Sequence, residues 1–82
     1  MGEKLPVLSG REVISILVHA GFQVKRQTGS HVHLIGINKQ TQQRTLVTVP
    51  VHGSKEVLPK TLLSILRQAG IARDDFQRLV DN

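Results

Sequence analysis

The residues best suited to chemistry lie in one short stretch, Thr28-Gly29-Ser30-His31-Val32-His33-Leu34. The ordinary pKa of histidine lies close to neutral pH, so its ring can both accept and donate a proton in water. A further histidine, His52, follows in a later polar segment. These residue types suit general acid–base catalysis. By residue type alone, however, His31 and His33 are interpreted as ordinary exposed histidines on a strand. His52 is likewise interpreted as a loop histidine that shapes its turn.

The pattern around this stretch predicts two strands joined by a tight turn. Over residues 22–27, Phe22, Val24 and Arg26 alternate with three polar residues, which is the period of a half-buried strand. Gly29 can adopt the positive φ that a short hairpin turn needs. In the next strand, residues 31–37, we expect Val32 and Leu34 to face the core. Alternation then places both histidines of this strand together on the opposite face.

The remaining elements complete an α-β-β-β-α order with a short third helix. Ser9 and Glu12 have the spacing of a capping box before an apolar helical stripe. The predicted elements are a helix over about 10–20, a third strand over 44–51, a helix from Pro59 to Gly70 and a short helix over 73–80. The polar segment 38–43 is expected to be a mobile hairpin loop. We therefore predict a single α+β domain over residues 1–82, a three-stranded antiparallel sheet with two helices on one face, which resembles the double-stranded-RNA-binding fold.

Composition points to a polyanionic partner. Eleven Lys and Arg against six Asp and Glu give a net charge of +5, which favours nucleic acid or an acidic protein surface. The chain has no Trp or Tyr, and the patterns around Phe22 and Phe76 suggest core positions. Modules that read single strands by stacking bases on aromatic side chains are therefore disfavoured. Contacts to phosphates, to overall shape and to the 2′-hydroxyl fit better.

Other functional classes are disfavoured by what the chain does not contain. The sequence has no cysteine, which removes disulfides, thiol nucleophiles and cysteine-bound zinc. The start Met1-Gly2-Glu3-Lys4-Leu5-Pro6 has no apolar leader segment, and no run approaches the roughly 20 apolar residues of a membrane span. We expect a cytoplasmic protein with no membrane contact. His31, His33 and His52 have no carboxylate cluster beside them, so we expect no metal and no other cofactor.

Five segments in order carry a family resemblance. They are Leu8-Ser9-Gly10-Arg11-Glu12-Val13, Ala20-Gly21-Phe22, Arg26-Gln27-Thr28-Gly29-Ser30-His31, Val49-Pro50-Val51-His52-Gly53-Ser54-Lys55-Glu56 and Leu62-Leu63-Ser64-Ile65-Leu66-Arg67-Gln68-Ala69-Gly70-Ile71. Together, over about residues 5–80, they resemble the HicA (YcfA-like) toxins, the mRNA-interferase component of HicAB toxin–antitoxin modules. The tripeptide Gly-Ser-His alone is a weak signal, whereas the segments in this order and spacing are specific.

The resemblance implies an activity and partners. The family's catalytic histidine follows Gly-Ser, which corresponds to His31 in this chain. The family cuts mRNA without a metal and independently of the ribosome. Its antitoxin, HicB, covers the toxin and recruits the complex to operator DNA, so we expect DNA contact only through that complex. Two positions depart from the family: Val32 stands where many members have a second histidine, and Ala72 where the last helix often opens with Ser or Thr.

With this resemblance, His31 is expected to be the general acid or base, and the second proton carrier is either His33 or His52. Charge on the phosphate would be stabilised by cations beside the histidines. The expected RNA-contacting residues are Lys25, Arg26, Gly29, Ser30, Lys55 and Lys60, although Gly29 and Ser30 first serve the turn. Two other functions stay open: a module of the same fold that binds double-stranded RNA without cutting it, and an interaction domain whose basic face docks an acidic partner.

Overall fold

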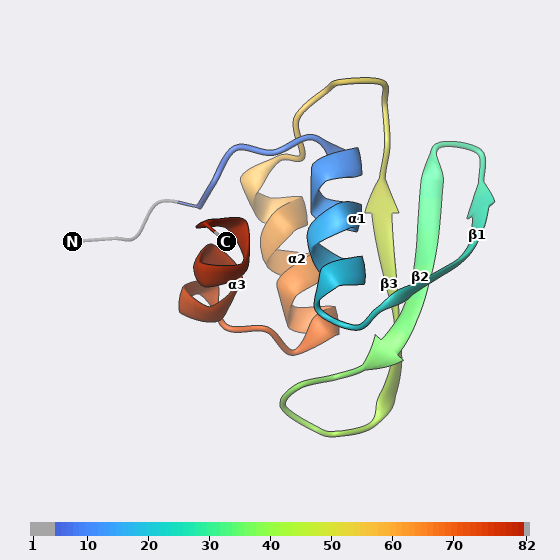
Figure 1. The fold of residues 1–82 in the computed structure, drawn as a ribbon. Coiled ribbons are helices and arrows are strands. Elements are labelled where there is room, and N and C mark those ends of the chain that lie inside the picture. Colours follow the sequence, from blue (N-terminus) through green and yellow to red (C-terminus); the bar gives the residue numbers. More distant parts are fainter. Residues whose placement is uncertain (1–4, 82) are drawn as a thin grey trace.

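A computed structural model describes residues 5–81 as three helices and one sheet (Figure 1). Met1–Lys4 and Asn82, which belong to the single domain predicted over 1–82, lie outside the described residues. No helix within the described part has the length and apolar character needed to cross a membrane. In chain order the elements are α1 (Gly10–His19), β1 (Gln23–Thr28), β2 (His31–Ile37), β3 (Arg44–Pro50), α2 (Pro59–Ala69) and α3 (Arg73–Asp81).

The three strands form an antiparallel sheet in the order β1-β2-β3, so β2 is the central strand. Figure 1 shows α1 and α2 over one face of the sheet, and α3 on the far side of these two helices. Within residues 5–81, the other face of the sheet carries no helix. This arrangement confirms the predicted α+β fold of the double-stranded-RNA-binding type, with its open sheet face and its short additional helix.

The helices begin and end where local chemistry predicts. The Ser9 hydroxyl accepts from the Glu12 N–H at 3.2 Å, and the Glu12 carboxylate accepts from the Ser9 N–H at 2.9 Å. This reciprocal capping box satisfies two backbone donors that the first turn of α1 leaves free. In α2, Pro59 occupies the first turn and Gly70 ends the helix in the left-handed conformation with φ 70°.

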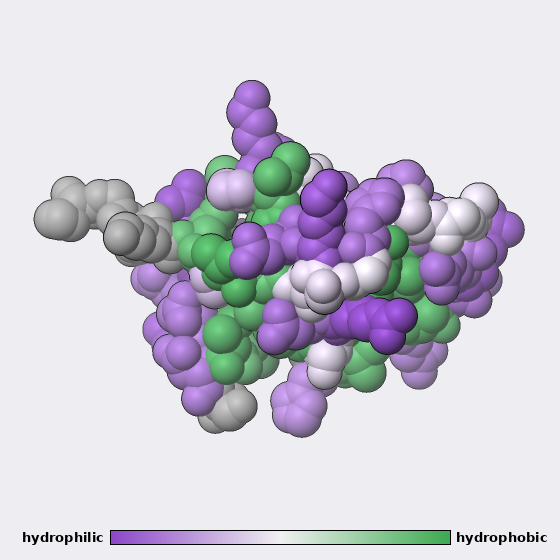
Figure 2. Space-filling model, turned by 90° about the horizontal axis from the view of Figure 1, so that it is seen from above, coloured by the Kyte–Doolittle hydropathy of each residue, from purple (hydrophilic) through white to green (hydrophobic). Residues whose placement is uncertain are grey.

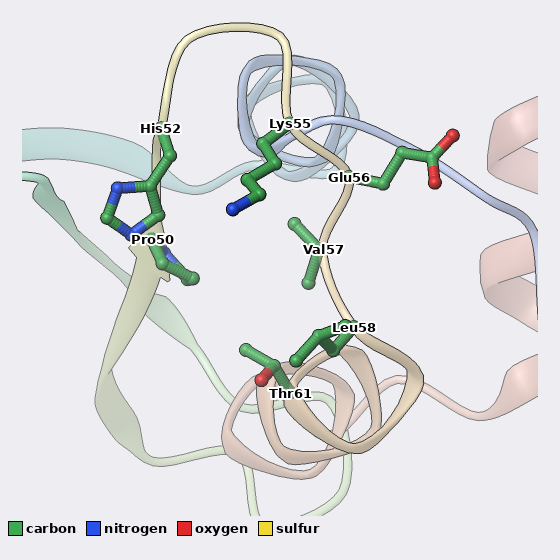
Figure 3. Close-up of a pocket in the computed structure, with 7 residues that line it drawn as sticks. All are labelled: Pro50, His52, Lys55, Glu56, Val57, Leu58 and Thr61. Carbon is green, nitrogen blue, oxygen red and sulfur yellow. The ribbon is translucent and has the colours of Figure 1, made fainter.

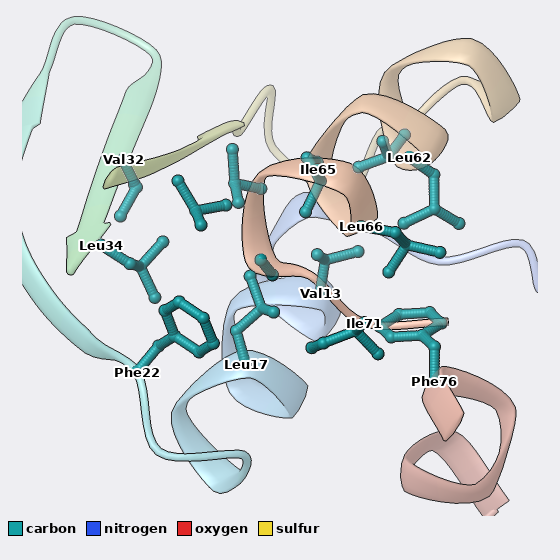
Figure 4. Close-up of a cluster of buried hydrophobic side chains, with 14 residues drawn as sticks. Val13, Leu17, Phe22, Val32, Leu34, Leu62, Ile65, Leu66, Ile71 and Phe76 are labelled. Carbon is teal, nitrogen blue, oxygen red and sulfur yellow. The ribbon is translucent and has the colours of Figure 1, made fainter. Parts of the chain in front are cut away.

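The core lies between the sheet and the helices (Figure 4). Val32 and Leu34 point from β2 toward α1 and α2, as the alternation predicts. Phe22 and Phe76 are 1% and 0% exposed, which confirms both as core residues. The largest core side chains that are fully or almost fully removed from solvent are Val13, Leu17, Phe22, Leu34, Val47, Val49, Leu62, Ile65 and Phe76. Each contributes roughly 1.5–3 kcal/mol of transfer free energy on burial.

The prediction that residues 22–27 form a half-buried strand is wrong for β1. Every side chain of β1 is exposed, and only Phe22, just before the strand, is buried. The pairing of β1 with β2 is interrupted by a bulge between Val24 and Arg26, and β1 lies at the edge of the sheet. A bulge shifts the alternation of side chains between the two faces of a strand. The apolar–polar pattern therefore does not report burial here.

The loop between β2 and β3 is fastened to α2, although its length and polarity favour a mobile segment. Asn38 is the first residue of this loop, and its side-chain oxygen accepts the N–H groups of Gln40 at 2.8 Å and Thr41 at 2.9 Å. Its amide nitrogen donates to the Gln68 carbonyl at 3.0 Å. The Lys39 N–H donates to the carbonyl of Ala69 at 3.0 Å. The end of the sheet away from His31 is thus tied to the end of α2.

Candidate functional site

The two histidines of β2 lie on the face of the sheet that the helices leave open. His31 is exposed and His33 is half-buried, whereas Val32 and Leu34 between and beyond them are 7% and 0% exposed. This confirms the prediction that His31 and His33 share one face. Because the helices lie on the opposite side, a ligand as large as a nucleic acid has direct access to His31.

Strand register places specific neighbours beside each histidine. His31 is opposite Thr28 of β1 and Pro50 of β3. One row further along, His33 is opposite Arg26 and Thr48. Residues directly opposite in an antiparallel pair have Cα atoms about 4.5–5.5 Å apart and project to the same face. The register therefore brings the predicted residue Arg26 onto the open face beside His33.

His33 is held by a hydrogen bond that sequence reasoning did not find. Its Nδ1 lies 3.1 Å from the hydroxyl of Thr48, and both residues are half-buried. Thr48 is itself fixed from α2, because its backbone N–H donates to the side-chain oxygen of Gln68 at 3.2 Å. Gln68 in turn donates to the hydroxyl of Ser64 at 3.1 Å. The ring of His33 is thus oriented by a chain of contacts that reaches into α2.

The turn before His31 has the geometry predicted from Gly29. Gly29 has φ 58°, and its carbonyl accepts the side-chain amide of Gln27 at 3.0 Å. The carbonyl of Ser30 accepts the N–H of Val51 at 2.6 Å, so pairing continues one step beyond the end of β3. Gly29 and Ser30 therefore lie beside the segment that leads from β3 to His52.

His52 and Lys55 are brought together by a second turn. The Lys55 N–H donates to the His52 carbonyl at 2.9 Å, and Gly53 inside the turn has φ 60°. Both side chains line a pocket of about 330 Å³ between the end of β3 and the start of α2 (Figure 3). The residues that line it are Pro50, His52, Lys55, Glu56, Val57, Leu58 and Thr61. Pro50 is the cross-strand partner of His31, so this pocket adjoins the catalytic candidate.

The remaining predicted RNA-contacting residues lie farther from the histidines. Lys25 is at the bulge of β1, where it lines a shallow hollow with Ile35 and Arg44. Lys60 is exposed in the first turn of α2 but does not line the His52 pocket. The structure therefore joins Lys55 to His52 and Arg26 to His33, and leaves Lys25 and Lys60 as outlying cations.

The four predicted lysine and arginine contacts are exposed and available for phosphates. Within residues 5–81 the one ion pair joins Arg78 to Asp75 on α3, so Lys25, Arg26, Lys55 and Lys60 have no described carboxylate partner. Figure 2 views the end of the molecule that carries the turn before His31 and the loop after β3. Hydrophilic side chains cover most of that end, with hydrophobic patches among them.

Thr48, Val57, Leu58 and Thr61 line the site but were missed by sequence reasoning. Thr48 left a signal: it stands between Val47 and Val49, and strand alternation sends it to the face of the histidines. The sequence contains no such signal for Leu58 or Thr61, because the path of the loop determines where these side chains point. Among the described residues, no group of three or more histidine and acidic side chains is arranged to hold a metal ion.

Comparison with known proteins assigns the chain to a family. No curated protein and no solved structure matches it. The family model described as the HicA toxin of bacterial toxin–antitoxin systems matches residues 10–71. That range runs from the first residue of α1 through all three strands to the end of α2, and α3 follows beyond it. The chain therefore belongs to the HicA toxin family and is the toxin of a toxin–antitoxin pair, with a cognate antitoxin as its partner.

Proposed function

We propose that this toxin is a metal-independent and ribosome-independent mRNA endoribonuclease in which His31 is the catalytic general acid or base. The observation that carries the proposal is the position of His31. It is exposed on the open face of the sheet, at the end of the central strand, one row from Arg26 and His33. Family membership supports a toxic activity, and the chemistry of the site supports RNA cleavage.

The reaction uses the substrate's own 2′-hydroxyl as the nucleophile on the adjacent phosphorus. One group must remove the 2′-hydroxyl proton, and another must protonate the 5′-oxygen that leaves. In an in-line displacement these two oxygens lie on opposite sides of the phosphorus, so two proton carriers must flank it. His31 can perform either step, which contributes roughly 10²–10⁴-fold to the rate.

We assign the second proton transfer to His33. Residues two apart on a strand have Cα atoms about 6.6 Å apart, so His31 and His33 can approach one phosphate from two sides. The contact of His33 Nδ1 with Thr48 orients the ring of His33 before substrate arrives. Arg26, opposite His33, supplies positive charge for the extra negative charge of the transition state.

The other predicted contacts hold the RNA backbone on either side of this centre. Lys25, Lys55 and Lys60 bind phosphates, and the backbone of Gly29 and Ser30 approaches the chain at the turn. A Cβ atom at Gly29 would have no heavy atom within 4 Å, so the turn leaves room for a close approach. We further propose that a HicB-like antitoxin inhibits the toxin, and that the complex of the two proteins contacts operator DNA only through the antitoxin. The toxin is proposed to act in the cytoplasm.

The proposal is tested by RNA cleavage in excess EDTA with the wild-type protein, His31→Ala and His19→Ala. His19 is an exposed histidine at the end of α1, outside the site, and serves as the matched control. We expect His31→Ala to lose at least about 10²-fold in cleavage rate at unchanged thermal stability. His19→Ala should cleave like the wild type. The products should end in a 2′,3′-cyclic phosphate, which identifies the 2′-hydroxyl as nucleophile.

Other outcomes of this experiment favour the two alternative functions, an RNA-binding module and a protein-interaction domain. Equal cleavage by the wild type and His31→Ala contradicts the role of His31. Tight, salt-sensitive binding of double-stranded RNA without cleavage favours a binding module, with a salt slope of about 0.9 per phosphate contact. No affinity for RNA at modest salt favours a domain that only docks an acidic protein.

A further inference from the structure

We propose that the pocket between β3 and α2, lined by His52 and Leu58, binds one unstacked nucleobase of the RNA next to the scissile phosphate. This base subsite would determine which sequences the toxin cuts. The inference rests on the endoribonuclease function proposed above. It also gives His52 a role in binding, distinct from proton transfer.

The walls of the pocket suit a flat, partly apolar ligand. Its volume of about 330 Å³ lies at the lower end of the range for small-molecule pockets, roughly 300–1,000 Å³. Figure 3 shows Val57, Leu58 and Thr61 directed into the open space from the side of α2. The carboxylate of Glu56 points away from it, so the negative charge nearest the pocket does not face the ligand.

The apolar lining favours a base over a bare phosphate. Leu58 is 69% exposed, which leaves a large aliphatic side chain in water at the mouth of the pocket. Pro59, the next residue, has no N–H to offer an anion. A base covers this aliphatic surface, whereas a phosphate ion leaves it exposed.

The His52 ring supplies the stacking surface. The chain has no Trp or Tyr, and both phenylalanines are buried, so sequence composition disfavours base stacking. Imidazole rings also stack on bases. His52 lines the pocket opposite the aliphatic side chains of Val57 and Leu58, which lie just before α2, and a base can lie between them (Figure 3). The hydroxyl of Thr61 and the ammonium group of Lys55 stand at the same pocket for polar contacts with the base edge or its phosphate.

The position of the pocket links it to the cleavage step. Pro50 lines the pocket and is the cross-strand partner of His31, with Cα atoms about 4.5–5.5 Å apart. The hydrogen bond from Val51 to Ser30 fixes this junction. A base held in the pocket therefore places a neighbouring phosphate at His31, so base identity controls which phosphate is cut.

The first test measures binding without cleavage. Amide chemical shifts of ¹⁵N-labelled His31→Ala protein are followed during titration with each of the four nucleoside 5′-monophosphates, and separately with inorganic phosphate. We expect at least one nucleotide to shift the amides of residues 55–58 and Thr61, while phosphate leaves most of them unchanged. Leu58→Ala should weaken this binding about fivefold or more. Val18→Ala is the control, because Val18 is also an exposed apolar side chain, at 47%, but lies on α1 and does not line this pocket.

The base subsite is contradicted if no nucleotide shifts these amides at millimolar concentration. It is equally contradicted if phosphate alone reproduces the shifts, or if Leu58→Ala and Val18→Ala weaken binding to the same extent. Nucleotide binding at the pocket without any RNA cleavage by the wild type contradicts the proposed endoribonuclease but not the subsite. Cleavage without nucleotide binding contradicts the subsite alone.

The second test separates stacking from proton transfer at His52. Cleavage sites of the wild type, His52→Phe and His52→Ala are mapped on one long unstructured RNA. Phenylalanine stacks but cannot carry a proton, so His52→Phe should keep the wild-type preference at one position next to the cut, while His52→Ala should flatten it about tenfold. If both variants lose cleavage alike and the remaining cuts keep the wild-type preference, His52 is a proton carrier and the stacking role is wrong.

Discussion

Replacing Asn38 by alanine should destabilise the protein strongly without touching its chemistry. Asn38 closes the loop after β2 and makes four side-chain hydrogen bonds. It also lies just beyond the far end of β2 from His31, about 23 Å along the chain direction. Stability and cleavage should therefore respond independently to changes at Asn38 and at His31.

The size of the effect follows from the individual bonds. Three of them measure 2.8–3.0 Å: the two that Oδ1 accepts from Gln40 and Thr41, and the one that Nδ2 donates to Gln68. The fourth, to the Arg67 carbonyl, measures 3.5 Å and contributes little. A net hydrogen bond is worth about 0.5–1.5 kcal/mol, and the two loop bonds are exposed and belong at the low end. We expect a loss of about 2 kcal/mol, or about 8–16 °C in Tm for a domain of this size.

Thermal and urea unfolding followed by circular dichroism measure this loss. Gln40→Ala is the control, because Gln40 is exposed in the same loop and its side chain makes no hydrogen bond within the described residues. It should change Tm by less than about 4 °C, since surface changes stay within about 0.5 kcal/mol. At a temperature where Asn38→Ala is folded, its cleavage rate should match that of the wild type.

A double-mutant cycle with Gly70 sharpens the test. Gly70 has φ 70°, and a Cβ atom there would collide with the side-chain oxygen of Asn38. Gly70→Ala alone should therefore lower the free energy of unfolding by more than the backbone strain at this φ accounts for. Combined with Asn38→Ala it should cost less than the sum of the two single changes, because the collision with the Asn38 side chain is removed and only that with the Lys39 backbone nitrogen remains. Strict additivity, or a loss below about 0.5 kcal/mol in Asn38→Ala, would refute the contribution assigned to this loop.

Three further predictions concern the site and the core. Thr48→Val removes the hydroxyl that is hydrogen-bonded to His33. Steady-state kinetics should therefore show a severalfold fall in kcat with little change in KM. A change in KM alone contradicts the role of Thr48 in orienting His33. Gly36→Ala drives a methyl group into the buried Phe22 ring, so urea unfolding should show a loss of about 1–3 kcal/mol, and an unchanged midpoint contradicts this packing. Ser9→Ala removes the cap of α1 and should cost about 1 kcal/mol in the same assay, more than Ser15→Ala at an exposed position inside the helix.

The parts of the fold that follow from local chemistry were predictable. The capping box, the turn at Gly29 and the opposite faces of Val32 and His33 depend on residues close together in sequence, and the structure confirms all three. The family resemblance is confirmed by the match over residues 10–71. The catalytic role of His31 stays a prediction, because the match names a family of toxins and not a reaction.

The parts that failed or were missed depend on contacts across the fold. Alternation in β1 could not show that a bulge at Lys25 shifts the register, nor that the helices leave this edge uncovered. The bond between His33 and Thr48 joins residues fifteen positions apart, and its support from Gln68 comes from a helix. The pocket at Leu58 depends on the path of an irregular loop, which no periodic pattern encodes.

The exposed edge strand β1 has a consequence for how the free toxin behaves in solution. An unpaired strand edge is a template for pairing with another chain, which leads to aggregation. The bulge beside Lys25 and the charges of Lys25 and Arg26 interrupt that template, since bulges and edge cations both oppose strand addition. Replacing Lys25 and Arg26 by neutral residues in order to weaken RNA binding therefore also removes charges that oppose self-association. Lys25→Ala and Arg26→Ala should be compared with the wild type by light scattering before any loss of cleavage is assigned to RNA.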